Sequence, residues 1–436
     1  MTDPSTAPTG RSISGRSFKV ALTVVLTLAL VVRVAVAVHY GHIPPQTDAV
    51  DYDRHAVSIA DGDGYPEALE VTGGPGPTAF RPPLYPFVLA GVYKLSGTSD
   101  QQKRWDYARI AQAVVGTLVV ALVALIGLQL LGRREALVAA AIAAIYPPLI
   151  LAGSTFLTEP LFTALILAGI AAILHYRGGD DRLRWLFVAG ALAGLATLTR
   201  TNGVTLIALL ALGAWTVRPR FSRRAVVAPA AAVAASVVVI APWTIRNAVE
   251  LDAFVPVSTQ AGYALAGQHN RVAAENRAEW IAPFRVPDYR PLFTGEHLGE
   301  VELTDRLGDR AKDYALDHPD DVVAAAFWNT LRMLYLDDPV DTERSVAFSS
   351  GQPQGLAEVS IYAFWLLVLL AIAGCLVGAA RRIPSFLWLL PILLLISPMF
   401  VVGLTRYRVP ADPLLVLLAA FAVTWAWTRL SSRSSA

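Results

Sequence analysis

The charged residues of the first long polar segment have the types and spacing to carry chemistry. Asp48, Asp51 and Asp53 stand in TDAVDYD, and Arg81 stands in FRPPLYP. Asp48 and Tyr52 are four residues apart, so a helix here would place both on one face. A carboxylate in such a place can accept the proton of an attacking hydroxyl. Asp48 could equally cap the helix that follows it, and the sequence leaves both roles open.

The triplet Asp51-Tyr52-Asp53 also has the D-x-D pattern that holds a metal and a nucleotide sugar in other proteins. The pattern is short, and two solvated aspartates explain it more simply. The chain has a single cysteine, Cys375, and no H-E-x-x-H spacing among its seven histidines, so a zinc site is unsupported. We therefore expect no cofactor and no metal site, and a divalent metal requirement stays open.

Arg81 precedes a helix-like stretch, where a guanidinium can hold phosphate oxygens in a bidentate way. A snorkelling arginine that meets lipid phosphates in general is the alternative. Glu159 in FLTEPLFT stands at the mouth of an apolar run. It could be a simple helix-start acid, or a functional acid that pairs with Arg200 in LTRTNG.

Four further arginines stand at the same ends of apolar runs as Arg81. Cations there oppose the usual charge bias of membrane proteins. Together with Arg81 they predict a cavity that binds phosphate. They are Arg200, Arg246, Arg406 and Arg408.

The composition indicates what must position these side chains. Of 436 residues, 55% are hydrophobic and only 16% are charged, against roughly a quarter charged in soluble proteins. Several apolar runs reach the roughly 20 residues that cross a bilayer. The net charge of +2 is too small to suggest nucleic acid as a partner. We therefore expect an all-α polytopic membrane protein in contact with the lipid bilayer.

The apolar runs predict about ten membrane-spanning helices within one domain, residues 16–436, after a disordered tail at residues 1–15. The first span follows Arg16 and Lys19, and is too long for a signal peptide. The other spans are expected at about 109–131, 136–153, 159–176, 185–199, 203–217, 225–245, 356–380, 384–404 and 410–428.

The charges between the spans predict the orientation. With these spans, five groups of arginines fall on the side of the N-terminus. They are Arg133/Arg134, Arg177/Arg182/Arg184, Arg218/Arg220/Arg223/Arg224, Arg381/Arg382 and Arg429/Arg433. The positive-inside rule then places both termini in the cytoplasm and the candidate site on the outer face of the plasma membrane.

Two outer loops, residues 39–108 and 246–355, carry the polar material. The first contains two helix-like pieces, of which PPLYPFVLAGVYKLSG is expected to lie on the membrane surface. The second contains DVVAAAFWNTLRMLYL, which is expected to form another amphipathic surface helix. No part of the second loop has the periodicity to close a core of its own.

Three stretches resemble one family: TDAVDY…FRPPLYPFVLAG, APWTIRNAVELDAFVPVSTQAGYALAGQHN and GLTRYRVPADPLLVLLAA. In order and spacing they resemble the polyprenyl-phosphate-sugar-dependent glycosyltransferases of the GT-C superfamily. The nearest groups are the protein O-mannosyltransferase and aminoarabinose-transferase-like proteins. The likeness spans almost the whole chain.

The resemblance implies inverting transfer of a sugar from a polyprenyl-phosphate-linked donor to a glycan, lipid or protein acceptor. Asp48 matches the presumed base, while Arg81, Arg246, Arg406 and Arg408 match contacts to the lipid phosphate. The aminoarabinose transferases have Asp-Glu where this chain has Asp48-Ala49, and Lys in place of Arg81, so the sugar and the acceptor stay open. Substrate contacts are expected from Asp51, Tyr52, Tyr85, Glu159, Arg200, Asn247 and His269.

Two other kinds of protein fit part of the pattern. A transporter or flippase of lipid-linked sugars would also have ten spans and outer arginines. Transporters place their sites near the bilayer midplane, whereas the carboxylates here gather at one surface. A non-catalytic scaffold with the same fold is the third possibility.

Overall fold

The computed structural model describes residues 13–179, 182–215, 223–295 and 297–433. These residues form helices and loops, and the described part contains no β-strand beyond one isolated bridge between Glu67 and Pro77. The all-α prediction is confirmed. The predicted tail lies outside the described residues up to position 12, and its last residues begin the first helix, which Ser14 caps through its side chain.

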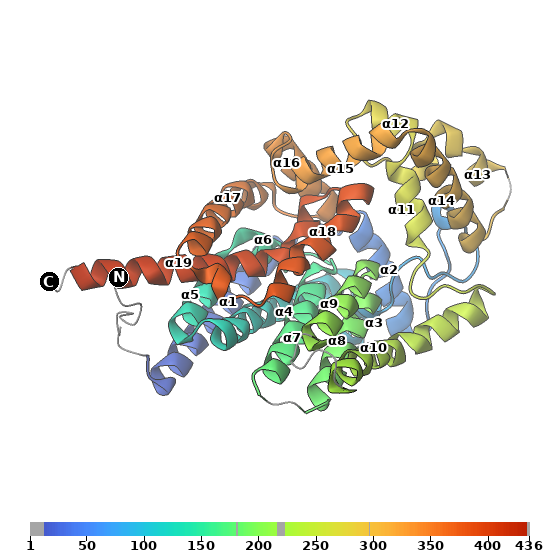
Figure 1. Ribbon diagram of the computed structural model, residues 1–436. Helices are drawn as coiled ribbons and strands as arrows, with labels where there is room; N and C mark the ends of the chain where they lie inside the picture. The colour runs from blue at the N-terminus through green and yellow to red at the C-terminus, as the bar shows by residue number, and fades with distance from the viewer. Residues whose placement is uncertain (1–12, 180–181, 216–222, 296, 434–436) are drawn as a thin grey trace.

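The membrane part is a bundle of apolar helices (Figure 1). Its members are α1 (Gly15–His39), α4 (Gln101–Leu130), α5 (Arg133–Ile145), α6 (Pro147–Ala152), α7 (Glu159–Arg177), α8 (Arg184–Thr199), α9 (Val204–Trp215), α10 (Arg223–Glu250), α17 (Gln354–Leu376), α18 (Leu389–Val401) and α19 (Asp412–Arg433). Among the described residues, six segments are long and apolar enough to cross a membrane, and three shorter apolar helices accompany them. The multi-pass prediction is therefore confirmed, while the count of ten is not.

The span expected at 136–153 is broken into α5 and α6 at Tyr146, because Pro147 and Pro148 cannot continue the hydrogen bonding of a helix. The break leaves carbonyl groups without helical partners. The guanidinium of Arg33, which is buried in α1, donates to the carbonyl oxygens of Ala143 and Ala144 at 3.0 Å each. Arg33 therefore closes the end of α5.

The helices α8 and α10 pack closely because two glycines of α8 face α10. A Cβ at Gly190 would lie 2.1 Å from the carbonyl oxygen of Ala232, and a Cβ at Gly194 would lie 2.9 Å from that of Ser236. Such small-residue contacts let helices in membranes approach each other closely.

Replacing Gly190 with alanine is therefore expected to push α8 away from α10 and to destabilise the protein by about 1–3 kcal/mol. Thermal unfolding in detergent measures this loss. Gly91→Ala is the matched control, because a Cβ at Gly91 in a neighbouring helix meets nothing within 4 Å. Equal melting temperatures for the two variants would contradict the close packing.

The outer loops form the remaining helices: α2 (Asp48–Asp61), α3 (Leu84–Ser96), α11 (Gln260–Gln268), α12 (Arg271–Glu275), α13 (Pro291–Thr294), α14 (Glu300–Asp317), α15 (Pro319–Met333) and α16 (Pro339–Ser350). Helix α3 buries Tyr85, Leu89 and Tyr93 and exposes Phe87 and Leu95. Apolar side chains therefore lie on both faces of α3. Its buried face packs on α2 and α4, and its place on the membrane surface stays a prediction.

Helix α15 exposes the apolar Val323 and Phe327 and buries Ala325, Asn329 and Met333 on its other face. The expectation that the second outer loop closes no core is partly wrong. Apolar side chains of α11, α13, α14 and the loops between them form a small cluster, which Phe80 of the first outer loop completes. The start of α1 and the end of α19 lie at one end of the molecule, and α11–α14 lie at the other (Figure 1).

Candidate functional site

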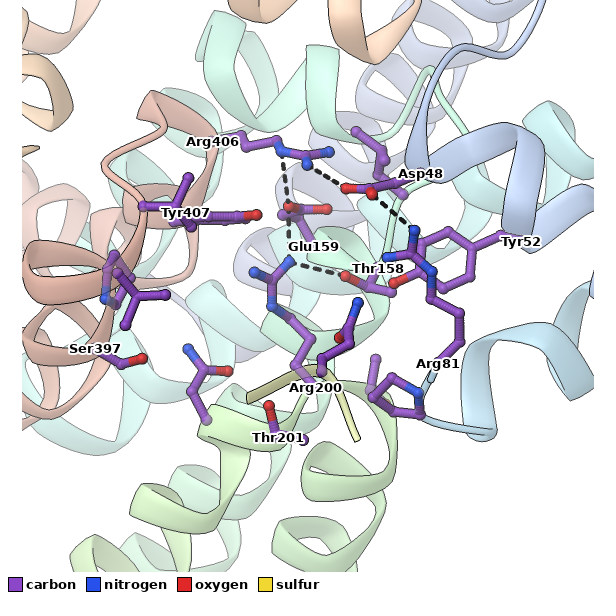
Figure 2. A pocket seen from close by; sticks show the side chains of 18 residues that line it. Asp48, Tyr52, Arg81, Thr158, Glu159, Arg200, Thr201, Ser397, Arg406 and Tyr407 are labelled. Carbon is purple, nitrogen blue, oxygen red and sulfur yellow. Dashed lines mark hydrogen bonds and ion pairs between the residues drawn. The ribbon is translucent and has the colours of Figure 1, made fainter. Parts of the chain in front are cut away.

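A polar cavity of about 140 Å³ lies where α2, the loop before α3, and the start of α7 meet the turn after α8, the start of α11, the end of α18 and the 3₁₀ helix η7 (Thr405–Ala411). Figure 2 shows its side chains. The polar and charged residues that line it are Asp48, Tyr52, Arg81, Thr158, Glu159, Thr199, Arg200, Thr201, Asn202, Gln260, Ser397, Arg406 and Tyr407.

Asp48 stands between two arginines at the edge of this cavity (Figure 2). Its Oδ1 accepts a hydrogen bond from Arg81 Nη2 at 2.9 Å, and its Oδ2 accepts one from Arg406 Nη2 at 2.5 Å. It is the first residue of α2, after Thr47, whose φ of 41° is unfavourable for a β-branched residue. The Thr47 hydroxyl donates to the carbonyl oxygen of Ser349 at 2.6 Å and so fixes this helix start.

Arg81 is also held by Asp51, which follows Asp48 in α2 by about one helical turn. Asp51 Oδ2 accepts from Arg81 Nε at 2.7 Å, while Asp51 Oδ1 accepts from Arg54 Nε and Nη2 at 3.2 and 3.1 Å. The guanidinium carbon of Arg81 also lies 5.0 Å from the ring centroid of Tyr52. Asp51 therefore orients a cavity residue and does not line the cavity itself.

The loop that carries Arg81 is fixed by a buried carboxylate, Glu300 at the start of α14. Its oxygens accept from the Thr78 hydroxyl and, at 2.8 Å, from the Ala79 backbone N–H. Burial raises the pKa of Glu300, although these hydrogen bonds oppose the shift. The hydroxyl of Tyr65 donates to the Arg81 carbonyl oxygen at 2.6 Å and completes the support.

A second ion-pair group lies across the cavity from Arg81. Arg200 Nη1 donates to Glu159 Oε1 at 2.8 Å and to the Thr158 hydroxyl at 2.9 Å. Arg406 Nε lies 3.8 Å from Glu159 Oε1. The predicted pair of Glu159 with Arg200 is present, and Arg406 links it to Asp48.

The cavity lining carries an excess of positive charge. Three guanidinium groups, of Arg81, Arg200 and Arg406, face two carboxylates, of Asp48 and Glu159. Burial by itself would raise the pKa of the Asp48 carboxyl, but Arg81 and Arg406 outweigh burial and hold that pKa well below its usual range. Asp48 is therefore ionised. The three guanidinium groups and two carboxylates leave a net positive charge in the cavity, which one bound anion of single charge would neutralise.

Arg406 is positioned by its neighbours in η7. The hydroxyl of Thr405 donates to Glu343 Oε2 of α16 at 2.7 Å. On the other side, Arg408 Nε donates to Asp412 Oδ1 at 3.1 Å, and Arg408 Nη1 donates to the Met333 carbonyl oxygen at 2.6 Å. Arg408 is thus a buried anchor outside the cavity lining, and the phosphate contact predicted for it is not supported.

Glu343, which accepts the hydrogen bond from Thr405 of η7, makes the stability of the folded protein depend on pH. Burial raises the pKa of Glu343 from its ordinary value of 4.5 to about 7. Between these two pKa values, Glu343 keeps its proton in the folded protein but has lost it in the unfolded chain. The contribution of Glu343 to the stability is therefore complete below the unfolded pKa and is lost as the pH rises through the folded pKa.

Glu343→Gln is expected to remove this pH dependence, because glutamine does not titrate. Relative to the variant, the wild type should lose about 2 kcal/mol of stability between roughly pH 5 and pH 8. Melting temperatures in detergent across this range measure the difference. Parallel curves for the two proteins would show that Glu343 is not protonated in the fold.

Arg246 and Asn247 also lie outside the cavity lining. Arg246 Nη1 donates to the Thr78 carbonyl oxygen at 2.7 Å, and its guanidinium carbon lies 4.9 Å from the ring centroid of Trp243. The buried Asn247 donates from Nδ2 to the Val255 carbonyl oxygen at 3.0 Å. Arg246 thus supports the loop of Arg81 from α10, while the predicted contact with a phosphate is not supported.

Tyr85 and His269 are predicted substrate contacts that are buried elsewhere. The Tyr85 hydroxyl accepts from Gln112 Nε2 at 2.9 Å, and its ring packs edge-on against Tyr52, which lines the cavity. His269 ends α11, and its carbonyl oxygen accepts from the Tyr289 hydroxyl at 3.0 Å. Tyr85 therefore supports a cavity residue from outside the cavity lining, and His269 also lies outside that lining.

The cavity also contains residues that the sequence reading did not select. Neutral polar side chains come from Thr158, Asn202, Gln260, Ser397 and Tyr407. The guanidinium carbon of Arg200 lies 4.5 Å from the ring centroid of Tyr407. The one available signal was adjacency: Thr158, Asn202 and Tyr407 are each within two residues of a charged residue that was selected.

The two aspartates of the D-x-D pattern are buried, so the expectation that they are solvated is wrong. Asp51 is engaged with Arg81 and Arg54, while Asp53 accepts from the Tyr93 hydroxyl at 2.5 Å. Among the described residues, no group of three or more His, Cys, Asp and Glu side chains is placed to hold a metal ion.

Comparison with known proteins agrees with the resemblance expected from the sequence. Residues 80–245, less than half of the chain, match the family model described as dolichyl-phosphate-mannose-protein mannosyltransferase. No curated protein matches the sequence significantly.

Solved structures share the fold at low sequence identity. The oligosaccharyltransferase of Archaeoglobus fulgidus in its apo form has a TM-score of 0.61 and 13% identity, covering 97% of this chain and 52% of that one. AglB from the same organism, in complex with an inhibitory peptide and a dolichol-phosphate, has a TM-score of 0.56 and 11% identity, with coverages of 96% and 51%.

ArnT from Cupriavidus metallidurans bound to undecaprenyl phosphate has a TM-score of 0.43 and 17% identity, with coverages of 94% and 78%. The chain spans about half the length of the two archaeal structures. The chain thus shares the fold of the archaeal oligosaccharyltransferase structures, which is the GT-C fold expected from the sequence, and its residues 80–245 match the family model of the dolichyl-phosphate-mannose-protein mannosyltransferases.

Proposed function

We propose that this protein is an inverting membrane glycosyltransferase that moves a sugar from a polyprenyl-phosphate donor to an acceptor hydroxyl. The observation that carries the proposal is the placement of Asp48 between Arg81 and Arg406 in a cavity with excess positive charge. The family match and the dolichol-phosphate of the AglB complex support a lipid phosphate as the anionic ligand.

In this reaction Asp48 accepts the proton of the acceptor hydroxyl as its oxygen attacks the anomeric carbon. The bond from that carbon to the phosphate oxygen breaks, and its electron pair leaves with the phosphate. Arg81 and Arg406 stabilise the charge that develops there, with Arg200 nearby. Groups placed in advance at developing charge lower the barrier more than they strengthen ground-state binding.

The outer face of the plasma membrane is the proposed side of the reaction. Asp48 follows α1 and Arg406 precedes α19, so the cavity lies away from the start of α1 and the end of α19. The arginine-rich loops are predicted from the sequence to lie on the side of these two chain ends, which the positive-inside rule places in the cytoplasm. The acceptor is proposed to be an envelope glycan, lipid or protein.

Purified protein in detergent tests the activity against transport. Given polyprenyl-phosphate sugars extracted from the source membranes, together with an envelope fraction as acceptor, it should release polyprenyl phosphate and glycosylate the envelope fraction. A flippase has no second compartment in detergent and would leave the donor unchanged. An intact donor, with protein shown to be folded by its thermal transition, would reject the enzyme in favour of the transporter.

A further inference from the structure

Asp48 and Asp51 both pair with Arg81, but their surroundings differ. Asp51 is 8% exposed and accepts two hydrogen bonds from Arg54 in addition to the one from Arg81. The side chain of Asp48 is 30% exposed, faces the cavity, and has its described hydrogen bonds with Arg81 and Arg406. Of the two carboxylates, Asp48 is therefore the one that another anion can replace.

A phosphate that takes the Nη2 donors of Arg81 and Arg406 competes with Asp48 for them. Arginine offers forked N–H groups that suit phosphate oxygens, and here the inner-facing Nη2 atoms of Arg81 and Arg406 are bonded to Asp48. Arg81 keeps its bond from Nε to Asp51 while its Nη2 changes partner, because the two atoms are separate donors.

The exchange also changes the chemistry of Asp48. A carboxylate whose two oxygens are bonded to two guanidinium groups is a weak proton acceptor. Once a phosphate takes over those groups, the same carboxylate loses both counter-charges and becomes more basic. The excess positive charge of the cavity lets the phosphate enter before Asp48 is protonated.

We propose that the donor phosphate displaces Asp48 from Arg81 and Arg406, and that this displacement frees the carboxylate to accept the acceptor's proton. The inference rests on the proposed function and adds an order to it: donor first, proton transfer second. After transfer, the proton is on Asp48 and the leaving phosphate carries one more negative charge, which keeps it on the arginines. Release of phosphate and proton restores the Asp48 ion pairs.

The test is the affinity for farnesyl phosphate, a short lipid phosphate, measured by calorimetry in detergent. Asp48→Asn removes the competing charge but keeps an oxygen that accepts hydrogen bonds. We expect the variant to bind farnesyl phosphate about tenfold more tightly than the wild type, because its arginines have lost a counter-ion. Asp53→Asn, on the same helix and bonded to Tyr93, should bind as the wild type does.

Equal or weaker binding by Asp48→Asn, with tight binding by the wild type, would overturn the displacement and leave the proposed function standing. Failure of both proteins to bind farnesyl phosphate would overturn the proposed function and the inference with it. The two failures are therefore distinguishable.

Infrared difference spectroscopy gives a readout that a purely structural role for Asp48 would not change. Adding farnesyl phosphate should shift a carboxylate stretching band in the wild type and in Asp53→Asn. The shift should be absent from Asp48→Asn. An unchanged band on binding to the wild type would show that Asp48 keeps its arginines and would overturn the proposal.

Discussion

Asp48→Asn is expected to slow glycosyl transfer by about 10²–10⁴-fold, the usual contribution of a general base. Asparagine has nearly the same shape, and its amide oxygen can still accept a hydrogen bond from one of the two arginines, so the fold should persist. It cannot accept the proton of the attacking hydroxyl. The initial rate of polyprenyl phosphate release, at saturating donor, measures the loss.

Asp53→Asn is the control for this experiment, since Asp53 lies on the same helix but bonds to Tyr93 outside the cavity. Its rate should stay within a fewfold of the wild type. If Asp48→Asn transferred sugar as fast as this control, the base would have to be another group, and the closest carboxylate in the cavity is Glu159.

Arg406→Gln and Arg408→Gln are expected to fail in different ways, although the two residues are separated only by Tyr407. Loss of Arg406 removes a group that stabilises the leaving phosphate and should lower the turnover rate by about 10²–10³-fold in a folded protein. Loss of Arg408 leaves Asp412 buried without its cation and should cost about 3–5 kcal/mol of stability.

Thermal unfolding and the turnover rate per folded molecule separate these two effects. Arg408→Gln should melt at a lower temperature, with a turnover rate per folded molecule near that of the wild type. The assignment would be reversed if Arg408→Gln kept its melting temperature but lost turnover, because Arg408 would then contact the reacting phosphate.

Much of this site is visible in the sequence because charge is rare in such an apolar chain. Asp48, Arg81, Glu159, Arg200 and Arg406 all stand at the ends of apolar runs, and in the fold they meet in one cavity. The helices could also be predicted from the sequence, since each apolar run corresponds to a helix or a pair of helices among the described residues.

The sequence could not show the direction of each side chain. Arg406 and Arg408 are two residues apart in a 3₁₀ helix, where each residue turns by about a third of a circle, so they point to different sides. Arg246 has a similar charge and a similar place at a helix end, but the carbonyl oxygen of Thr78 engages its Nη1. The neutral cavity residues Gln260 and Ser397 resemble many others at membrane boundaries and gave no signal.

The bond of Arg33 to the end of α5 has a consequence for how the protein enters the membrane. An arginine within an apolar helix costs roughly 2.5–3.5 kcal/mol to insert. During synthesis α1 emerges more than 90 residues before Ala143 and Ala144, whose carbonyl oxygens receive the guanidinium. We therefore expect the insertion of α1 to be completed only when α5 arrives beside it and its carbonyl oxygens receive the Arg33 guanidinium.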